Sequence, residues 1–184
     1  MNKTFLLISS LCLLFASCGN DNKTGTSENS GLSEGRPEYI ERIKKLEAEM
    51  HKSMQLNDVT AGLAVTAYDN FVKMFPDDSL APDFLFKAGE ITTATKQYPQ
   101  SLMYYQNITA KYPKYKLVDV SLYMQGVLLD NYLNDDAKAK TIYEEVIAKY
   151  PGSNYATDAK AAINNLGKSD EQLIEEFKKK NGQK

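Results

Sequence analysis

Side chains that could do acid–base or metal chemistry are few in this 184-residue sequence. His51 is its only histidine. Adjacent side chains on a helix point about 100° apart, so neighbouring acids do not converge on one substrate. The sequence contains no GxGxxG, P-loop, HExxH or GxSxG motif. We therefore predict no enzyme activity, no catalytic residue, no cofactor and no metal site, and interpret the paired acids as solvated helix starts and faces. These pairs are Asp77-Asp78, Asp135-Asp136, Glu144-Glu145 and Glu175-Glu176.

The N-terminal residues 1–17 have the layout of a secretory signal peptide. A basic start at Lys3 precedes an apolar run that ends at Phe15, and small residues follow. The run is too short to span a membrane. Its removal takes away Cys12 and leaves Cys18 as the only cysteine, so the mature chain cannot form an internal disulfide.

The segment "FASC" resembles a bacterial lipobox, in which the cysteine receives lipid and becomes the mature N-terminus. The resemblance implies lipidation of Cys18, although Phe15 stands where the family usually has an aliphatic residue. The alternative is an ordinary signal peptide with Cys18 as a free thiol. In similar lipoproteins the next residue helps to sort the protein between membranes. Gly19 favours the outer membrane of the cell envelope and leaves open which face the domain occupies.

A polar segment follows, so that residues 18–36 form the lipidated cysteine and a flexible tether. Leu32 is its only large apolar residue, too little to fold on. Such a coil spans roughly 20–25 Å. The net charge of −2, with both signs interspersed, provides no basic face for nucleic acid.

Three stretches nearly repeat one another: "YDNFVKMFP", "YQNITAKYP" and "YEEVIAKYP". Apolar residues fall at three- and four-residue spacing, which predicts helices throughout. The repeated tyrosines are predicted to lie in the core, and Gly89 and Gly126 would let a partner helix approach closely. The copies share a small residue, a tyrosine, an apolar residue and a proline, as Ala64-Tyr68-Phe71-Pro76, Ser101-Tyr105-Ile108-Pro113 and Ala139-Tyr143-Val146-Pro151.

The pattern predicts an all-α fold of antiparallel helix pairs. A repeat domain over 37–168 is followed by a C-terminal helix and charged tail over 169–184. That last helix begins at Ser169 with a capping box to Gln172. The other expected helices are 37–55 and 60–75, 82–96 and 99–112, 117–132 and 135–150, and a capping helix over 155–166.

These repeats resemble the tetratricopeptide repeat, with Gly89 and Gly126 at the family's small first-helix position. The 37–38-residue spacing exceeds the family's usual 34, and Leu85 and Leu122 replace its tryptophan. The resemblance implies an α-solenoid of about three repeats plus a capping helix. The lengthened repeat is similar to that of envelope lipoproteins, including the lipoprotein subunit of outer-membrane barrel assembly and the Tol–Pal coordinator family.

By this resemblance, a partner binds the concave face of the first helices. The mixture of apolar and acidic residues there disfavours a carboxylate clamp and favours a segment with apolar anchors and positive charge. Phe86 and Tyr123 could equally pack into the superhelix. The implied groove residues are Asp83, Phe86, Glu90 and Thr93, then Val120, Tyr123, Val127 and Asp130.

The resulting hypothesis is a lipid-anchored scaffold that binds envelope proteins or peptide segments, with an outer-membrane assembly or secretion machine as one setting. The alternative is a ligand-binding or cell-wall-processing envelope lipoprotein, which needs a closed pocket with convergent polar groups. A third class is an enzyme with an unfamiliar carboxylate pair, to be judged by the distances between carboxylates.

Overall fold

The computed structural model describes residues 35–52 and 58–182. All regular structure in these residues is helical, which confirms the all-α prediction, and each helix end that can be compared lies within two residues of its expected position. The helices are α1 (Arg36–Lys52), α2 (Asp58–Met74), α3 (Ala81–Ala94), α4 (Tyr98–Lys111), α5 (Val118–Asn131), α6 (Asp136–Lys149), α7 (Asn154–Asn165) and α8 (Asp170–Lys180).

The signal peptide, Cys18 and the tether lie outside the described residues, as does the expected end of the first helix at 53–55. Among the helices that are described, none is long and apolar enough to cross a membrane.

The ends of the helices follow from local chemistry. Pro82 and Pro99 lie in the first turns of α3 and α4, where the missing N–H group costs no helical hydrogen bond. Asp135 caps α6 by accepting a hydrogen bond from the backbone N–H of Lys138. The expected capping box at the start of α8 is confirmed, since the Ser169 hydroxyl accepts from the Gln172 backbone N–H and the Gln172 side chain accepts from that of Ser169.

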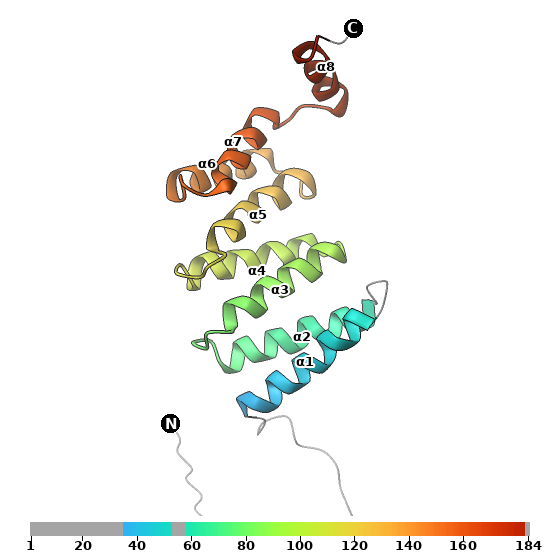
Figure 1. Cartoon of the computed structure of the whole chain (residues 1–184), viewed down its shortest axis with the longest axis vertical. Helices are drawn as coiled ribbons and strands as arrows, with labels where there is room; N and C mark the ends of the chain where they lie inside the picture. The colour runs from blue at the N-terminus through green and yellow to red at the C-terminus, as the bar shows by residue number, and fades with distance from the viewer. Residues whose placement is uncertain (1–34, 53–57, 183–184) are drawn as a thin grey trace, which may run out of the picture. The chain divides into compact units, whose positions relative to one another are not determined.

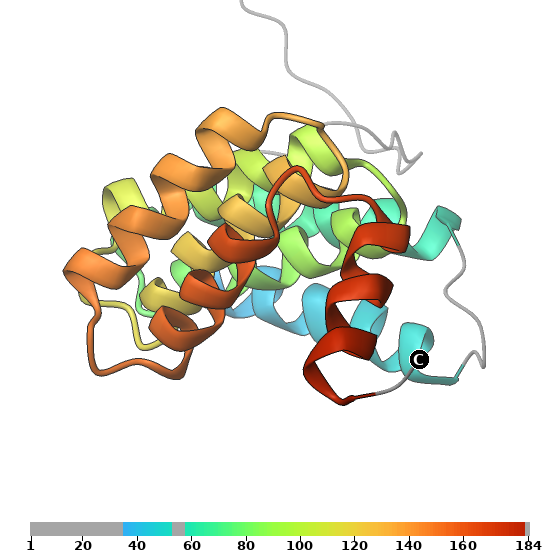
Figure 2. The ribbon, with the colours of Figure 1, turned by 90° about the horizontal axis from the view of Figure 1, so that it is seen from above.

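Successive helices pack as pairs, and the pairs stack in chain order (Figure 1). Within each pair, α1 packs on α2, α3 on α4 and α5 on α6. Between pairs, the second helix of one packs on the first helix of the next, as α2 does on α3 and α4 on α5. The fold is therefore an all-α solenoid like that of tetratricopeptide repeats. The view from above shows the helix pairs lying over one another (Figure 2).

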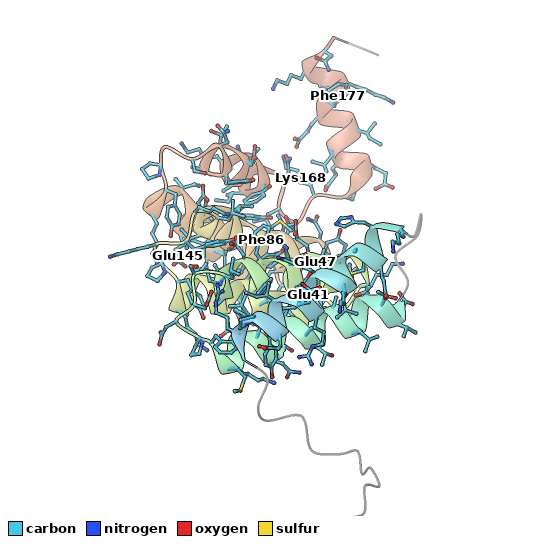
Figure 3. All side chains as sticks on the ribbon, turned by 60° about the horizontal axis from the view of Figure 1, so that its bottom comes forward. Glu41, Glu47, Phe86, Glu145, Lys168 and Phe177 are labelled. Atoms are coloured by element: carbon cyan, nitrogen blue, oxygen red, sulfur yellow. The ribbon has the colours of Figure 1, made fainter. Side chains whose placement is uncertain are left out.

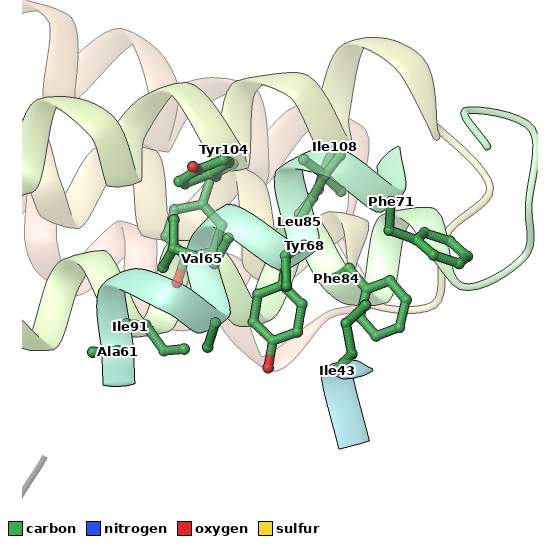
Figure 4. Packing of buried hydrophobic residues seen from close by; sticks show 14 of the residues in the cluster. Ile43, Ala61, Val65, Tyr68, Phe71, Phe84, Leu85, Ile91, Tyr104 and Ile108 are labelled. Atoms are coloured by element: carbon green, nitrogen blue, oxygen red, sulfur yellow. The ribbon is translucent and has the colours of Figure 1, made fainter. Parts of the chain in front are cut away.

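The three repeated tyrosines lie in the core, as predicted. Tyr68, Tyr105 and Tyr143 are 2%, 1% and 1% exposed. Tyr68 stacks on Phe84 with ring centroids 5.3 Å apart, which joins the first pair to the second (Figure 4). Burial of such aromatic side chains contributes a large share of the stability of each pair.

Gly89 and Gly126 allow the close approach expected of them. The ring of Tyr105 lies over Gly89, where an added Cβ would be 2.8 Å from its Cζ. The ring of Tyr143 lies over Gly126, where an added Cβ would be 2.5 Å from its Cε1. Each tyrosine thus occupies the space that a side chain on the first helix of its pair would need.

Hydroxyl groups of further tyrosines connect one pair to the next. The Tyr104 hydroxyl donates to Asp69 Oδ2 at 2.9 Å, and the Tyr112 hydroxyl donates to the carbonyl oxygen of Pro76 at 2.7 Å. Both bonds run from α4 or its end to the preceding pair. These bonds are directional, so they fix how one pair sits on another, which apolar contact alone does not.

The C-terminal end of the stack is covered by α7, which packs on α6 and α5 through buried Ala156 and Ala159. Gly167 follows with a φ of 73°, a left-handed conformation suited to glycine, and ends this helix as expected. Beyond it, α8 has no extensive packing against another described helix. Its Ile174 and Phe177 are 54% and 63% exposed.

Candidate protein-binding groove

The α3 part of the predicted groove is built around Phe86. This side chain is half-buried, with its ring edge-on to that of Tyr105 at 5.6 Å between centroids and tilted against that of Tyr115 at 6.4 Å. Asp83, one turn earlier, accepts a hydrogen bond from the Tyr115 hydroxyl at 2.7 Å. Lys116 also lies 3.2 Å from the Asp83 carboxylate. Phe86 therefore has one side packed into the superhelix and one side accessible to a partner, which are the two positions that the sequence left open.

The other two predicted residues of α3 differ in their surroundings. The Thr93 hydroxyl donates to the carbonyl oxygen of Gly89 at 2.8 Å and lies 2.6 Å from the Ser101 hydroxyl of α4. It therefore belongs to the contact within the helix pair as much as to the groove. Glu90 is exposed. Partial desolvation raises the pKa of Glu90, while the charge of Lys87 acts in the opposite direction.

The α5 part of the groove is built around Tyr123, which lies between Tyr143 and Tyr155 at centroid distances of 5.7 and 5.3 Å. Asp130 accepts a hydrogen bond from the Tyr143 hydroxyl at 3.2 Å. Partial desolvation raises the pKa of Asp130, although this hydrogen bond lowers it. Val127 is partly buried against the same apolar cluster.

Val120 is not on the surface, so its predicted exposure is wrong. It is only 8% exposed. Its helix, α5, packs against α4, α6 and α7, so more of its circumference is covered than in a helix with fewer neighbours. No direct contact of Val120 with a partner is expected from this position.

The α1 helix also contributes to the groove, although none of the predicted groove residues lies on it. Glu47, labelled in Figure 3, lies on α1. It accepts hydrogen bonds from the Tyr68 hydroxyl at 2.9 Å and from the Lys87 ammonium at 2.7 Å. A signal was present, because Glu47 follows buried Ile43 by four residues, as Asp130 follows Gly126. Without the structure, the different length of the α1–α2 connection hides this equivalence.

A hollow of about 350 Å³ lies between α1 and α3. Its lining combines apolar surface with two carboxylates, one ammonium group and the exposed imidazole of His51. The lining residues are Glu47, Met50, His51, Tyr68, Lys87, Glu90 and Ile91. Because Lys87 is already paired with Glu47, Glu90 gives this hollow its uncompensated negative charge.

A larger hollow of about 590 Å³ lies where the α2–α3 and α4–α5 connections meet. Its lining carries three lysines, Lys111, Lys114 and Lys116, and three aspartates. The carboxylate of Asp78 is held by an ion pair with Arg36. Both hollows are clefts open to solvent, whereas small ligands usually bind in deep, largely enclosed pockets.

Several of the paired acids are engaged by lysines or arginines, while Asp77 and Asp78 line the same hollow. Lys149 lies 2.5 Å from Glu145, and Lys140 lies 3.9 Å from Glu144. Within residues 35–52 and 58–182, no group of three or more His, Cys, Asp or Glu side chains is arranged to hold a metal ion.

The stacked helix pairs define a helical-repeat protein. Residues 120–153, which include most of α5 and all of α6, match the family model of the tetratricopeptide repeat. The match and the repeated architecture together support a tetratricopeptide-repeat protein. Proteins of this class generally mediate protein–protein interactions and are typically not enzymes. No curated protein matches the chain.

Proposed function

We propose that this protein is a lipid-anchored scaffold of the cell envelope that holds a segment of a partner protein in the groove formed by α1, α3 and α5. The observation that carries the proposal is the presence of a half-buried aromatic ring and an accessible acid on each of two first helices, Phe86 with Glu90 on α3 and Tyr123 with Asp130 on α5. Aromatic side chains in partly packed positions are frequent anchors of protein interfaces.

The charge of the groove indicates the chemistry of the partner. Acidic side chains outnumber basic ones there, and the lysines nearest to them, Lys87 and Lys116, are paired with Glu47 and Asp83. A carboxylate-binding groove would need unpaired basic residues. The favoured partner is therefore a segment that presents apolar anchors and carries positive charge, bound as a helix or as an extended strand.

The cellular setting follows from the N-terminal sequence. A lipid on Cys18 and a tether that ends before Arg36, the first residue of α1, would hold the repeat domain close to the outer membrane while leaving it free to reorient. Barrel assembly, secretion and envelope maintenance are settings in which such a scaffold would brace a multi-subunit machine.

Two aromatic substitutions test the groove. We expect Phe86→Ala together with Tyr123→Ala to lower recovery of the partner from gently crosslinked native membranes by about tenfold or more, since each side chain is a candidate anchor. The measurement is quantitative mass spectrometry of proteins that copurify with the full chain. Met103→Ala is the matched control, because Met103 is 61% exposed on α4, outside the groove.

Equal recovery by the double variant and the wild type would contradict the groove, provided that circular dichroism shows both chains folded. Recovery of no envelope protein by any form would contradict the scaffold function itself.

The lipid anchor has a separate test. Cells grown with a radiolabelled fatty acid should label the wild-type chain, and Cys18→Ser should abolish the label and shift the protein from the membrane to the soluble fraction. Labelling that persists in Cys18→Ser would contradict the anchor and leave the groove proposal unaffected.

A further inference from the structure

The N-terminal end of the stack carries an apolar groove between α1 and α2. Its volume is about 260 Å³, and Leu63 at its rim is 53% exposed. The lining residues are Arg42, Leu46, Leu63, Thr66, Ala67 and Asn70. End repeats of a solenoid are usually polar on their outer side, so an exposed leucine in this position calls for a physical explanation.

The third helix pair shows what covers such a groove. The hollow between α5 and α6 is lined by Leu129, Lys138, Thr141 and Ile142, and α4 of the preceding pair closes it with Leu102 and Gln106. Leu102 packs against the apolar cluster of α5, α6 and α7. The second helix of one pair therefore covers the groove of the pair that follows it in the stack.

The two grooves are equivalent in sequence. Leu63, Thr66 and Ala67 precede Tyr68 by five, two and one residues, and the three α6 residues of the covered hollow precede Tyr143 by the same intervals. The α1–α2 groove is thus the surface that the second helix of a preceding pair would cover, and α1 is the first of the described helices.

The helix α8 also has no extensive packing against another described helix. It follows α7 as α6 follows α5, which gives it the place of a second helix in a fourth pair. Its Leu173, Ile174 and Phe177 lie on one face, and Ile174 and Phe177 are mostly exposed. The exposed side of α7 carries polar residues such as Asp158 and Lys160, so α7 provides little apolar surface for α8 to cover.

The α8 helix cannot reach the α1–α2 groove of its own chain. Residues 166–169 join it to α7, and four extended residues span only about 13–14 Å. The second and third pairs lie between α7 and α1–α2. Two layers of helices, at 8–10 Å each, are about 16–20 Å thick, which is more than the connection can span.

We propose that α8 of one copy packs into the α1–α2 groove of a second copy, with Ile174 and Phe177 against Leu46 and Leu63. This contact continues the packing of α4 on the third pair from one molecule to the next. Because the two surfaces differ, the association is head to tail and produces rows of molecules along the membrane. Each molecule would keep its groove on α3 and α5 for a partner.

Two variants that each lose one end test the proposal. Leu63→Lys disrupts the contact surface in the α1–α2 groove by introducing the residue found at the equivalent position of α6, Lys138. Phe177→Glu disrupts the contact surface on α8. We expect sedimentation velocity of the full chain in detergent to show concentration-dependent association for the wild type. For each variant alone, the dissociation constant of the assembly should be at least about tenfold higher than for the wild type.

Mixing the two variants should restore association, but only to a 1:1 heterodimer, because one intact groove then meets one intact α8. Met103→Lys, an exposed substitution on α4, should leave association unchanged. A defect in folding could not produce such recovery on mixing.

A wild-type chain that remains monomeric over the concentration range, or variants that do not combine, would overturn the proposal. So would a photo-crosslinker at position 63 that reaches residues 1–34 of its own chain, as judged with mixed isotope-labelled copies. That result would identify the N-terminal segment as the occupant of the groove.

Discussion

Replacing Gly126 with valine is expected to lower the free energy of unfolding by about 2–3 kcal/mol. The first added carbon would already lie 2.5 Å from Cε1 and 2.7 Å from Cδ1 of Tyr143. This ring is 1% exposed and packs against Tyr123, so it has no space into which to withdraw. Urea unfolding followed by circular dichroism measures the loss.

Gly62 provides the matched control for this substitution. It also lies inside a helix, but an added Cβ there would meet nothing within 4 Å. Gly62→Ala is therefore expected to raise the free energy of unfolding by about 0.5–1 kcal/mol, because glycine is a poor helix former.

A double variant identifies the contact responsible. If the clash is with Tyr143, the double variant should lose less free energy of unfolding than the sum of the losses in Gly126→Val and Tyr143→Ala. Simple additivity, or a harmless Gly126→Val, would show that the ring does not require the glycine.

Stability is expected to fall steeply above about pH 10, by about 3–5 kcal/mol at pH 11. Desolvation raises the pKa of the buried Tyr68, Tyr104 and Tyr143, with added contributions from Glu47, Asp69 and Asp130 respectively, and raises that of Tyr105 to about 12. The unfolded chain ionises these phenols near their ordinary pKa, whereas the folded chain keeps them protonated.

The sign follows from these raised values. Between the unfolded and folded pKa, the folded state binds more protons, so each phenol lowers stability by ~1.4 kcal/mol per pH unit as the pH rises. Urea unfolding at pH 8, 10 and 11 measures the effect. Tyr104→Phe should reduce the slope by one proton, and a stability at pH 11 equal to that at pH 8 would contradict the prediction.

Much of the fold was predictable because repeated chemistry has repeated physical consequences. A tyrosine that recurs in the same setting needs a small residue opposite it, and Gly89 and Gly126 recur in step with Tyr105 and Tyr143. The first pair differs in one respect: Ile43 is buried there in place of a glycine, although Tyr68 hydrogen-bonds to Glu47 as Tyr143 does to Asp130. That exception is why the part of the groove on α1 could not be found from the repeat alone.

The predicted groove residues were harder to judge, because exposure depends on every neighbouring helix. The sequence is compatible with either a core or a surface position for Phe86 and Tyr123, and each is packed on one side and accessible on the other. Val120 occupies the position equivalent to Asp83, but it is buried. The same position in two repeats can thus have different exposure when one helix has an additional neighbour.

The sequence by itself determined which segments are helices, where they end and which pairs they form, because periodicity, prolines and caps act over a few residues. Only the tertiary structure decided which faces remain uncovered. Leu63 is exposed because no described helix packs on that side of α1–α2, and Phe177 is exposed because α8 has no extensive packing against another described helix. Exposure depends on elements distant in the chain, and a local pattern contains no information about whether such an element is present.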